Sequence, residues 1–246
     1  MTHIFSTLTT DNLEDAGDSL GGGGAVPSKV YDATIKVAYL GKAKSGANSL
    51  TVVADIGNRE YRETIYFTSG DSKGGKHYYE RDGKKYPLPG FTTVNDIALL
   101  ATGKDLSQQT MEEKVVKLYD YDAGKELPTQ VTVVSSLTGQ KVKLGIVRIR
   151  ENKTKKNDST GAYEPINEER LINNISKVFH ADTGKTVTEY QAKSDTAEFL
   201  PKWKEKHDGN DVDKYKEVTG SGKSGLPGGA SGGSSNAPAS GSSLFG

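Results

Sequence analysis

The sequence predicts an all-β protein with minor α-helix content and disordered ends. Three observations indicate this class. Apolar and polar residues alternate in several short segments, which is typical of half-buried strands. A single longer segment has helical spacing, and the last part of the chain is rich in glycine and serine. Of the 246 residues, 33% are hydrophobic, which suits a modest core diluted by ends that do not fold.

Composition sets the expected limits of the folded part. The glycine run 21–24 cannot hold a regular element, because glycine loses the most backbone entropy on ordering. Residues 220–246 have the composition of a flexible linker. We therefore expect an acidic flexible head at 1–26, a folded domain at 27–206 and a flexible tail at 207–246.

The first half of the domain predicts three strands. They are expected at 30–40, 49–56 and 61–68, with a turn-rich loop at 41–48 and a tight turn at Gly57-Asn58. In the first strand the alternation places four side chains on one face: Ala33, Ile35, Val37 and Tyr39.

The second half predicts one helix and further strands. Residues 91–102 have helical spacing, and Gly103 is a natural helix stop. Strand chemistry returns at 115–119, 130–137 and 140–150, and Thr138-Gly139 would join the last two as a hairpin.

A short amphipathic helix is expected near the C-terminal limit of the domain. It contains Phe199, Leu200 and Trp203, and Pro201 is tolerated only in its first turn.

Three strands, a helix and further strands that close the sheet is the order of a five-stranded oligonucleotide-binding (OB) barrel. The same short strands could form a sandwich. Closure into a barrel removes the exposed edges of a small sheet, so we expect an OB-fold-like barrel with insertions.

Several chemistries are excluded or disfavoured by composition. Without cysteine there is no disulfide, zinc–thiolate site or thiol nucleophile. The four histidines are scattered, and the glycine-rich segments 70–76 and 220–224 lack the context of a phosphate-binding loop. No apolar run is long enough to span a membrane, and the first charged residue is Asp11, unlike a secretory signal. The sequence predicts a cytoplasmic protein without metal, cofactor or membrane partner.

Segment 76–86 is the densest mixture of cationic and aromatic residues. It contains four lysines or arginines, one histidine and three tyrosines. Single-stranded nucleic acid is bound by rings that stack on bases and by cations that follow the phosphates. The alternative is that these tyrosines only pack on a sheet surface. The candidate binding residues of this segment are Lys76, Tyr78, Tyr79, Lys84, Lys85 and Tyr86.

Three further groups extend the candidate site. Arg62 and Tyr66 lie on the face of the third strand opposite Ile65 and Phe67, so they should project from the barrel. The loop between the first two strands, where OB folds commonly contact ligand, supplies Lys42 and Lys44. Segment 141–156 carries seven bases and one acid, which is typical either of a phosphate-tracking wall or of a solubilising surface. Its candidate residues are Lys143, Arg148 and Arg150.

An ordered series of motifs resembles a family of tailed-bacteriophage single-stranded DNA-binding proteins over about residues 29–206. The motifs are YRETIYFTSG at 61–70, KGGKHYY at 73–79, LPGF at 88–91, EKVVKLYD at 113–120, LGIV at 144–147, KVF at 177–179 and the stretch around Trp203. The resemblance implies an OB barrel that coats exposed DNA during phage replication, recombination or repair in the host cytoplasm. The site residues above rest on the physical argument alone.

The C-terminus departs from the usual pattern of such proteins. Many single-strand binders end in an acidic tail with a hydrophobic tip that recruits replication enzymes. Here Leu244 and Phe245 form an apolar tip, but no acid follows Glu217. Either the tip docks a partner protein, or the tail is only a spacer.

Two other functions remain open. A magnesium-dependent nuclease needs clustered carboxylates, and Asp105 with Glu112-Glu113-Lys114 is the nearest approach. A scaffold could instead recruit recombination enzymes through its two flexible ends. We expect a non-catalytic, sequence-tolerant binder of single-stranded DNA.

Overall fold

The computed structural model describes residues 24–57, 59–120 and 123–218, and its β content is high while its helices are few. The strands are β1 (Lys29–Lys42), β2 (Asn48–Asp55), β3 (Glu60–Tyr66), β4 (Tyr78–Arg81), β5 (Lys84–Pro87), β6 (Glu112–Asp120), β7 (Lys125–Val133), β8 (Lys141–Lys156), β9 (Tyr163–His180) and β10 (Val212–Asp213). The helices are α1 (Pro89–Thr102), α2 (Val187–Gln191) and α3 (Phe199–His207). The predicted class, all-β with minor α, is confirmed.

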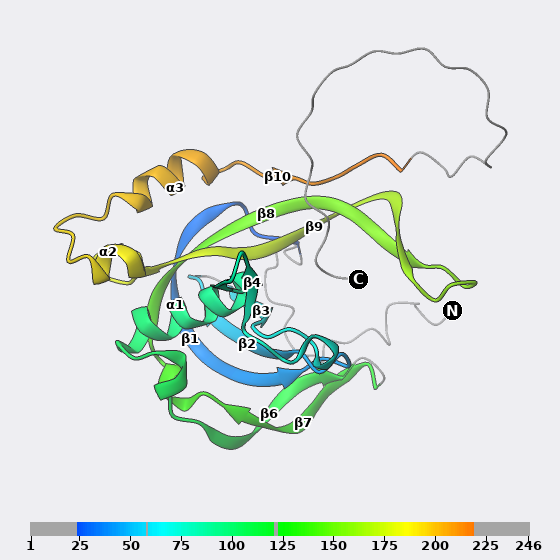
Figure 1. Ribbon diagram of the computed structural model, residues 1–246, viewed down its shortest axis with the longest axis horizontal. Helices are drawn as coiled ribbons and strands as arrows, with labels where there is room; N and C mark the ends of the chain where they lie inside the picture. Colours follow the sequence, from blue (N-terminus) through cyan, green and yellow to red (C-terminus); the bar gives the residue numbers. More distant parts are fainter. Residues whose placement is uncertain (1–23, 58, 121–122, 219–246) are drawn as a thin grey trace, which may run out of the picture.

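Strand β1 organises the main sheet, in which strands follow the order β10-β8-β1-β2-β3. One edge of β1 pairs with β2, and the other pairs first with β8 and then with β7. Strand β9 extends β8, and β6 extends β7. All these pairs are antiparallel except β10 with β8. Figure 1 shows the sheet curving around α1, while β4 and β5 form a separate two-stranded sheet.

A β-bulge corrects the expected face of the first strand. The register of β1 against β2 shifts between Ile35 and Val37. Because side chains alternate with a period of two, one extra residue exchanges the two faces beyond it. Ala33, Ile35 and Ala38 are therefore buried, whereas Val37 and Tyr39 are only half-buried.

The hairpin expected at Thr138-Gly139 is wrong. Strands β7 and β8 do not pair with each other, because both pair with the same edge of β1 in succession. A 3-10 turn at Ser135–Leu137 separates them, and the Gly139 N–H donates to the Ile35 carbonyl oxygen at 2.7 Å. The long strand β9 was also missing from the expectation.

Helix α1 fills the interior of the curved sheet. Its apolar face buries Val94, Ile97 and Leu100 against the core, as the spacing predicted. It ends at Gly103, whose φ of 75° is the left-handed cap that glycine favours. At its start, a Cβ on Gly90 would lie 1.9 Å from the Tyr66 carbonyl oxygen, so only glycine allows α1 to sit directly on the end of β3.

The sheet is open between β3 and β9, which form no strand pairing within the described residues. A half-buried side chain spans this seam instead. Glu63 on β3 accepts hydrogen bonds from the Ile175 N–H of β9 at 2.8 Å and from the Tyr61 hydroxyl at 2.5 Å. The five-stranded closure expected from the sequence is therefore not a continuous ladder.

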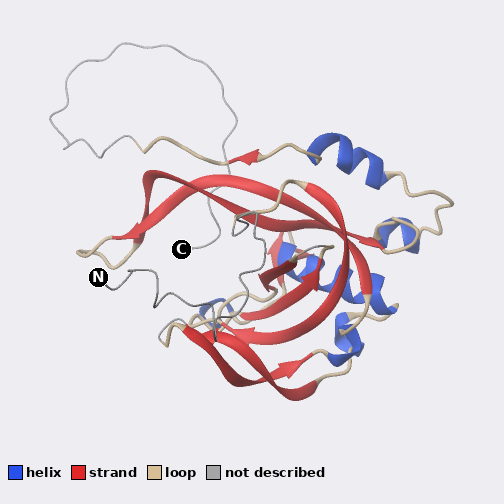
Figure 2. Cartoon of the chain, turned by 180° about the vertical axis from the view of Figure 1, so that it is seen from behind, coloured by secondary structure: helices blue, strands red, loops and turns tan. Residues whose placement is uncertain are grey.

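A second, smaller core lies on the outer face of β8 and β9, under α3. It consists of Val147, Ile149, Phe179 and Trp203. A Cβ on Gly145 would lie 3.0 Å from the Trp203 ring, whose Nε1–H donates to Ser176 Oγ at 3.0 Å. The predicted C-terminal helix is confirmed, with Pro201 in its first turn. In Figure 2, α2 and α3 lie at one end of the β8–β9 hairpin and its turn projects at the other.

The expected domain limit at residue 206 is too early. Residues 208–218 continue along β8 and β9, first through β10 and then through two asparagine clamps. The Asn152 side chain accepts from the Lys216 backbone N–H and donates to the Lys216 carbonyl oxygen. Asn167 makes the same two hydrogen bonds with the backbone of Val218. Asn173 holds Val26 in the same way at the N-terminal limit. The rest of the expected head and tail lies outside the described residues.

No helix within the described part of the chain is long and apolar enough to cross a membrane.

Candidate nucleic-acid interface

The basic-aromatic segment folds as the β4–β5 hairpin, which connects β3 to α1. Its turn residues Asp82 and Gly83 have φ values of 53° and 71°, as in the two-residue turns that favour tight hairpins. Tyr79 lies opposite Tyr86, and Arg81 lies opposite Lys84. These four side chains share one face of the hairpin. Tyr78, Glu80, Lys85 and Pro87 share the other.

Tyr79 and Tyr86 form an exposed aromatic platform. Their rings are stacked with centroids 5.5 Å apart and planes inclined by 23°. They remain 44% and 40% exposed, so the core does not account for them. Two nearly parallel rings on a surface are suited to stacking with unpaired bases.

The cations of the hairpin retain accessible charge. Lys84 and Lys85 form no ion pair within the described residues, and Lys85 Nζ lies 4.7 Å from the Tyr78 ring centroid. Lys76 approaches Glu80 at 3.8 Å and Arg81 approaches Asp82 at 3.5 Å. Such long, exposed ion pairs are weak, so a phosphate could displace the carboxylates.

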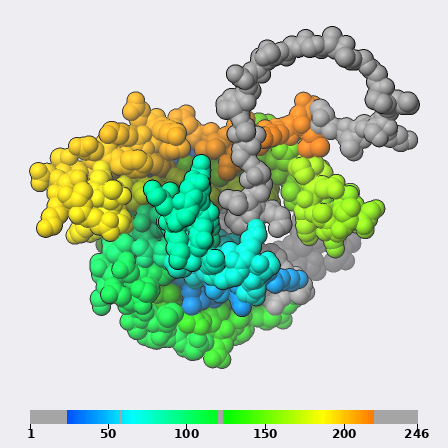
Figure 3. Space-filling view, in the orientation of Figure 1, coloured from blue at the N-terminus to red at the C-terminus, as the bar shows by residue number. Residues whose placement is uncertain are grey.

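The two lysines predicted from the β1–β2 loop lie near the segment that leads into this hairpin. The loop after β3 is tied to the β1–β2 turn, because the Asp71 N–H donates to the Ser45 carbonyl oxygen at 2.8 Å. This contact places Lys42, 4.0 Å from Asp71, and the exposed Lys44 beside the loop. Figure 3 shows the hairpin projecting from the face that also carries this loop.

Arg62 and Tyr66 project outward from β3, as predicted. Ile65, on the opposite face, belongs to the core, whereas Tyr66 is 51% exposed. Arg62 is exposed and lies 4.0 Å from Glu60.

The expected wall on β8 is occupied by the protein's own acids. Lys143 Nζ lies 2.6 Å from Asp32. Arg148 Nε donates to both carboxylate oxygens of Asp211, at 2.9 and 3.0 Å. The hydrogen bond from Arg148 to Asp211 also raises the pKa of the guanidinium. These side chains are not free to follow phosphates in this structure.

Arg150 is held more extensively than its neighbours. It contacts Glu169 at 2.6 Å and Asp213 at 3.0 Å, and its guanidinium lies 4.7 Å from the Tyr215 ring centroid. Its main contacts therefore fasten the C-terminal segment to β8.

The nuclease residues have ordinary structural partners. Asp105 caps the short 3-10 helix Leu106–Gln108, and Glu113 accepts a hydrogen bond from Thr132. The described part of the chain contains no group of three or more residues arranged to hold a metal ion.

Three exposed tyrosines of the described residues, Tyr119, Tyr163 and Tyr190, are not among the predicted site residues. The most exposed of them is Tyr163. It is 70% exposed and lies opposite Lys156 at the end of the β8–β9 hairpin. A turn-forming segment, NDSTG at 157–161, separates the lysines from this tyrosine. That pattern of lysine, turn and tyrosine could have identified it. Leu244 and Phe245 lie outside the described residues.

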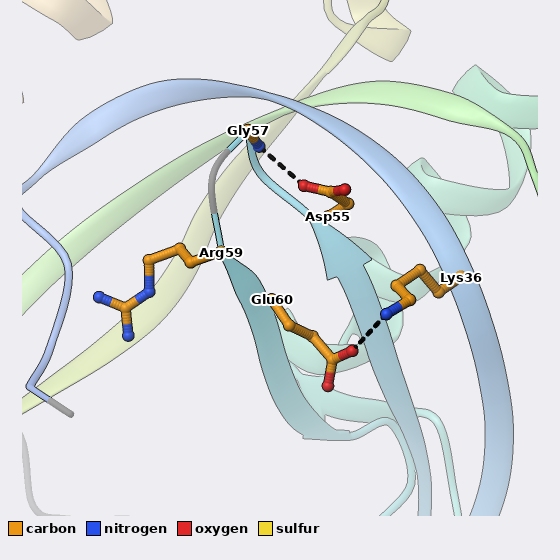
Figure 4. A pocket seen from close by; sticks show the side chains of 5 residues that line it. All are labelled: Lys36, Asp55, Gly57, Arg59 and Glu60. Atoms are coloured by element: carbon orange, nitrogen blue, oxygen red, sulfur yellow. Dashed lines mark hydrogen bonds and ion pairs between the residues drawn. The ribbon is translucent and has the colours of Figure 1, made fainter. Parts of the chain in front are cut away.

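A small polar hollow of about 260 Å³ lies at the β2–β3 turn. Figure 4 shows Lys36 reaching Glu60, at 2.7 Å, and the Gly57 N–H donating to Asp55. The hydrogen bond from Lys36 to Glu60 raises the pKa of Lys36. Arg59 instead donates to the Gly24 carbonyl oxygen. These polar groups therefore already have hydrogen-bond or ion-pair partners within the protein.

No protein-family model, curated protein or solved structure matches the chain. The geometry of these residues is therefore the basis for assigning a function.

Proposed function

We propose that this protein binds single-stranded DNA without strong sequence preference. The observation that carries the proposal is the exposed Tyr79–Tyr86 stack on a hairpin where Lys84 and Lys85 form no ion pair within the described residues. Rings supply stacking, which any base accepts, and the cations supply attraction to phosphates. Lys42 and Lys44, beside the loop that leads into the hairpin, and the exposed Arg62 and Tyr66 on β3 would extend the surface.

The arrangement of strands supports an OB-like barrel as the scaffold. A helix follows the third strand, and β1 is shared between β2 on one edge and β8 on the other. Strands β8 and β9 would complete a set of five with β1–β3, closed at the β3–β9 seam by Glu63 rather than by a ladder. The remaining strands are insertions and extensions of this set.

The proposed role is to coat exposed DNA during phage replication, recombination or repair in the host cytoplasm. This role follows the family resemblance described for the sequence motifs. Leu244 and Phe245 would then be the contact for replication or recombination proteins.

Binding of a fluorescent oligo-dT at increasing salt, with a duplex of equal length as control, tests the proposal. We expect preference for the single strand, and the logarithm of affinity should fall by about 0.7 per decade of salt for each phosphate neutralised. Retention of neither DNA at low salt would refute it. Adding Mg²⁺ to the same samples tests the nuclease, because cleavage abolished by Glu113→Ala would favour an enzyme.

A further inference from the structure

A hollow of about 300 Å³ lies between the base of the β4–β5 hairpin, α1 and β9. Pro87 and Pro89 are the accessible apolar residues of its lining, since Val178 is only 1% exposed. Asp96 from α1 and Lys177 from β9 supply an ion pair, with Asp96 Oδ2 and Lys177 Nζ 3.2 Å apart. Ligand pockets usually measure about 300–1,000 Å³, so this one suits a ligand no larger than one nucleobase.

Asp96 is an unusual residue for its position. It is the one charged residue of α1, and it is only 8% exposed. Burial raises the pKa of the Asp96 carboxyl, although Lys177 opposes that change. A buried ion pair is often no more stabilising than apolar residues of similar volume. Packing of α1 on β9 therefore does not explain why a charged pair lines the hollow.

The carboxylate retains capacity to bind a ligand. Its Oδ2 atom accepts from Lys177, and within the described residues no hydrogen bond to Oδ1 is formed. The ammonium of Lys177 carries three donors, of which Asp96 uses one. The Asp96 carboxylate and the Lys177 ammonium therefore present hydrogen-bond acceptors next to hydrogen-bond donors.

We propose that this hollow binds the guanine base of a nucleotide in the bound single strand. Guanine has two adjacent N–H groups, at N1 and N2, that a carboxylate accepts together, and its O6 accepts from an ammonium. The other three bases offer a carboxylate one such nitrogen on that edge. Pro87 and Pro89 would contact a face of the base. The inference rests on the proposed function and adds one base-selective position to a sequence-tolerant surface.

The hollow is placed to receive a base from a strand that follows the hairpin. Pro87, one of its walls, is the last residue of β5 and lies opposite Tyr78. Lys85 shares that face of the hairpin and has no ion pair within the described residues. A phosphate near Lys85 would leave the adjoining base close to the hollow.

Oligonucleotides with one changed base test the pocket on the unaltered protein. An oligo-dT with a single central dG should bind about 5–100-fold more tightly than plain oligo-dT or versions with one dA or dC. Hypoxanthine lacks the 2-amino group and should lose most of that gain. Equal affinity for all of them, with oligo-dT still bound, would overturn the pocket and leave the proposed function intact. Loss of binding to every oligonucleotide would instead overturn the function.

Variants locate the effect in the hollow. Asp96→Asn should remove the preference for dG and retain affinity for oligo-dT, whereas Asp195→Asn, an exposed carboxylate without an ion pair in the described structure, should change neither. If Asp96→Asn fails to fold, Thr93→Tyr should fill the hollow from α1 and abolish the preference. A preference for dG that survives in the folded variant would refute the assignment. Equal competition by free dGMP and by the dG oligonucleotide would refute the strand as the source of the base.

Discussion

The β4–β5 hairpin and strand β8 have similar compositions, but they differ in how closely acidic side chains approach their cations. Both are rich in lysine and arginine and lie near tyrosines. On the hairpin and at its base the nearest acids lie 3.5 to 4.0 Å from the cations. On β8, the acids lie 2.6 to 3.0 Å from Lys143, Arg148 and Arg150. A basic segment therefore indicates a binding surface only where the fold leaves its cations without close acidic partners.

Strand pairing explains the difference. Strand β8 is flanked by β9 and β10, which place Glu169 and Asp213 against Arg150. The two strands of the hairpin pair only with each other, and Arg81 lies directly opposite Lys84. Like charges in that position destabilise a sheet, so a hairpin that keeps them is suited to an anionic ligand.

The largest effect that separates the two regions is expected at Trp203. Trp203→Ala removes the ring that covers Gly145 and should lower the free energy of unfolding by about 3–5 kcal/mol. Affinity of the folded protein for oligo-dT should not change, because none of the residues packed with Trp203 under α3 belongs to the hairpin. Urea unfolding and fluorescence anisotropy measure the two quantities. A parallel loss of affinity would show that the outer face of β8 takes part in binding.

The second effect is expected at the aromatic platform, with the opposite pattern. Tyr79→Ala or Tyr86→Ala should weaken oligo-dT binding by about 1–3 kcal/mol, since each ring stacks on a base. The free energy of unfolding should stay within about 0.5 kcal/mol of the parent, as for other surface changes.

Tyr190→Ala is the matched control for the platform. Tyr190 is exposed and stacked on His180, as Tyr79 is on Tyr86, but it lies on α2. Its removal should leave affinity unchanged. If Tyr190→Ala and Tyr79→Ala weaken binding equally, exposed stacked rings of any location would be sufficient and the hairpin would not be the site.

The lysines of the hairpin should affect the salt dependence of binding. Lys84→Ala and Lys85→Ala should each reduce the salt slope by about 0.7 if each contacts one phosphate. Arg150→Ala should leave the slope unchanged and change stability little, because the pairs with Glu169 and Asp213 that it loses are exposed. Titrations at several salt concentrations measure the slope. A reduced slope for Arg150→Ala alone would move the phosphate path to β8.

Local signals in the sequence were sufficient for β1–β3, α1 and α3. Alternation, helical spacing and the Gly103 stop are patterns formed by residues close together in the sequence. The bulge in β1 was not predictable from alternation, because it depends on register against β2. Strand β9 escaped prediction because its first half is exposed and polar, so it lacks the alternation of a half-buried strand.

The candidate site was predictable in part for the same reason. The hairpin residues are close in sequence, and their mixture of rings and cations is visible there. The neutralisation of Arg148 by Asp211 joins residues 63 positions apart, and the pair of Asp96 with Lys177 joins residues 81 apart. Neither has a local signal. The second core under α3 also joins distant residues. The Trp203 ring lies against Gly145 and donates to Ser176, and each of these residues lies in or beside a different motif of the resemblance.

A pH-dependent effect is expected at Glu63, which joins β3 to β9 across the seam. Burial raises the pKa of this carboxyl, although its bonds with Tyr61 and Ile175 oppose the change. The folded state then holds the proton more tightly than the unfolded state. The stability contributed by this group is fully present below the unfolded pKa of about 4.3 and is lost as the pH rises through the higher folded value.

Glu63→Gln should therefore flatten the decline in stability between about pH 4 and pH 7, because glutamine keeps an acceptor for both donors and does not ionise. Asp96 is unchanged in the variant, so its own raised pKa cancels in the comparison. Glu63→Ala should instead cost about 1–3 kcal/mol for each donor left without a partner, at every pH. Urea unfolding at several pH values measures both. An identical pH dependence in Glu63→Gln would mean that water reaches this carboxylate at the β3–β9 seam, so that its pKa is not raised in solution.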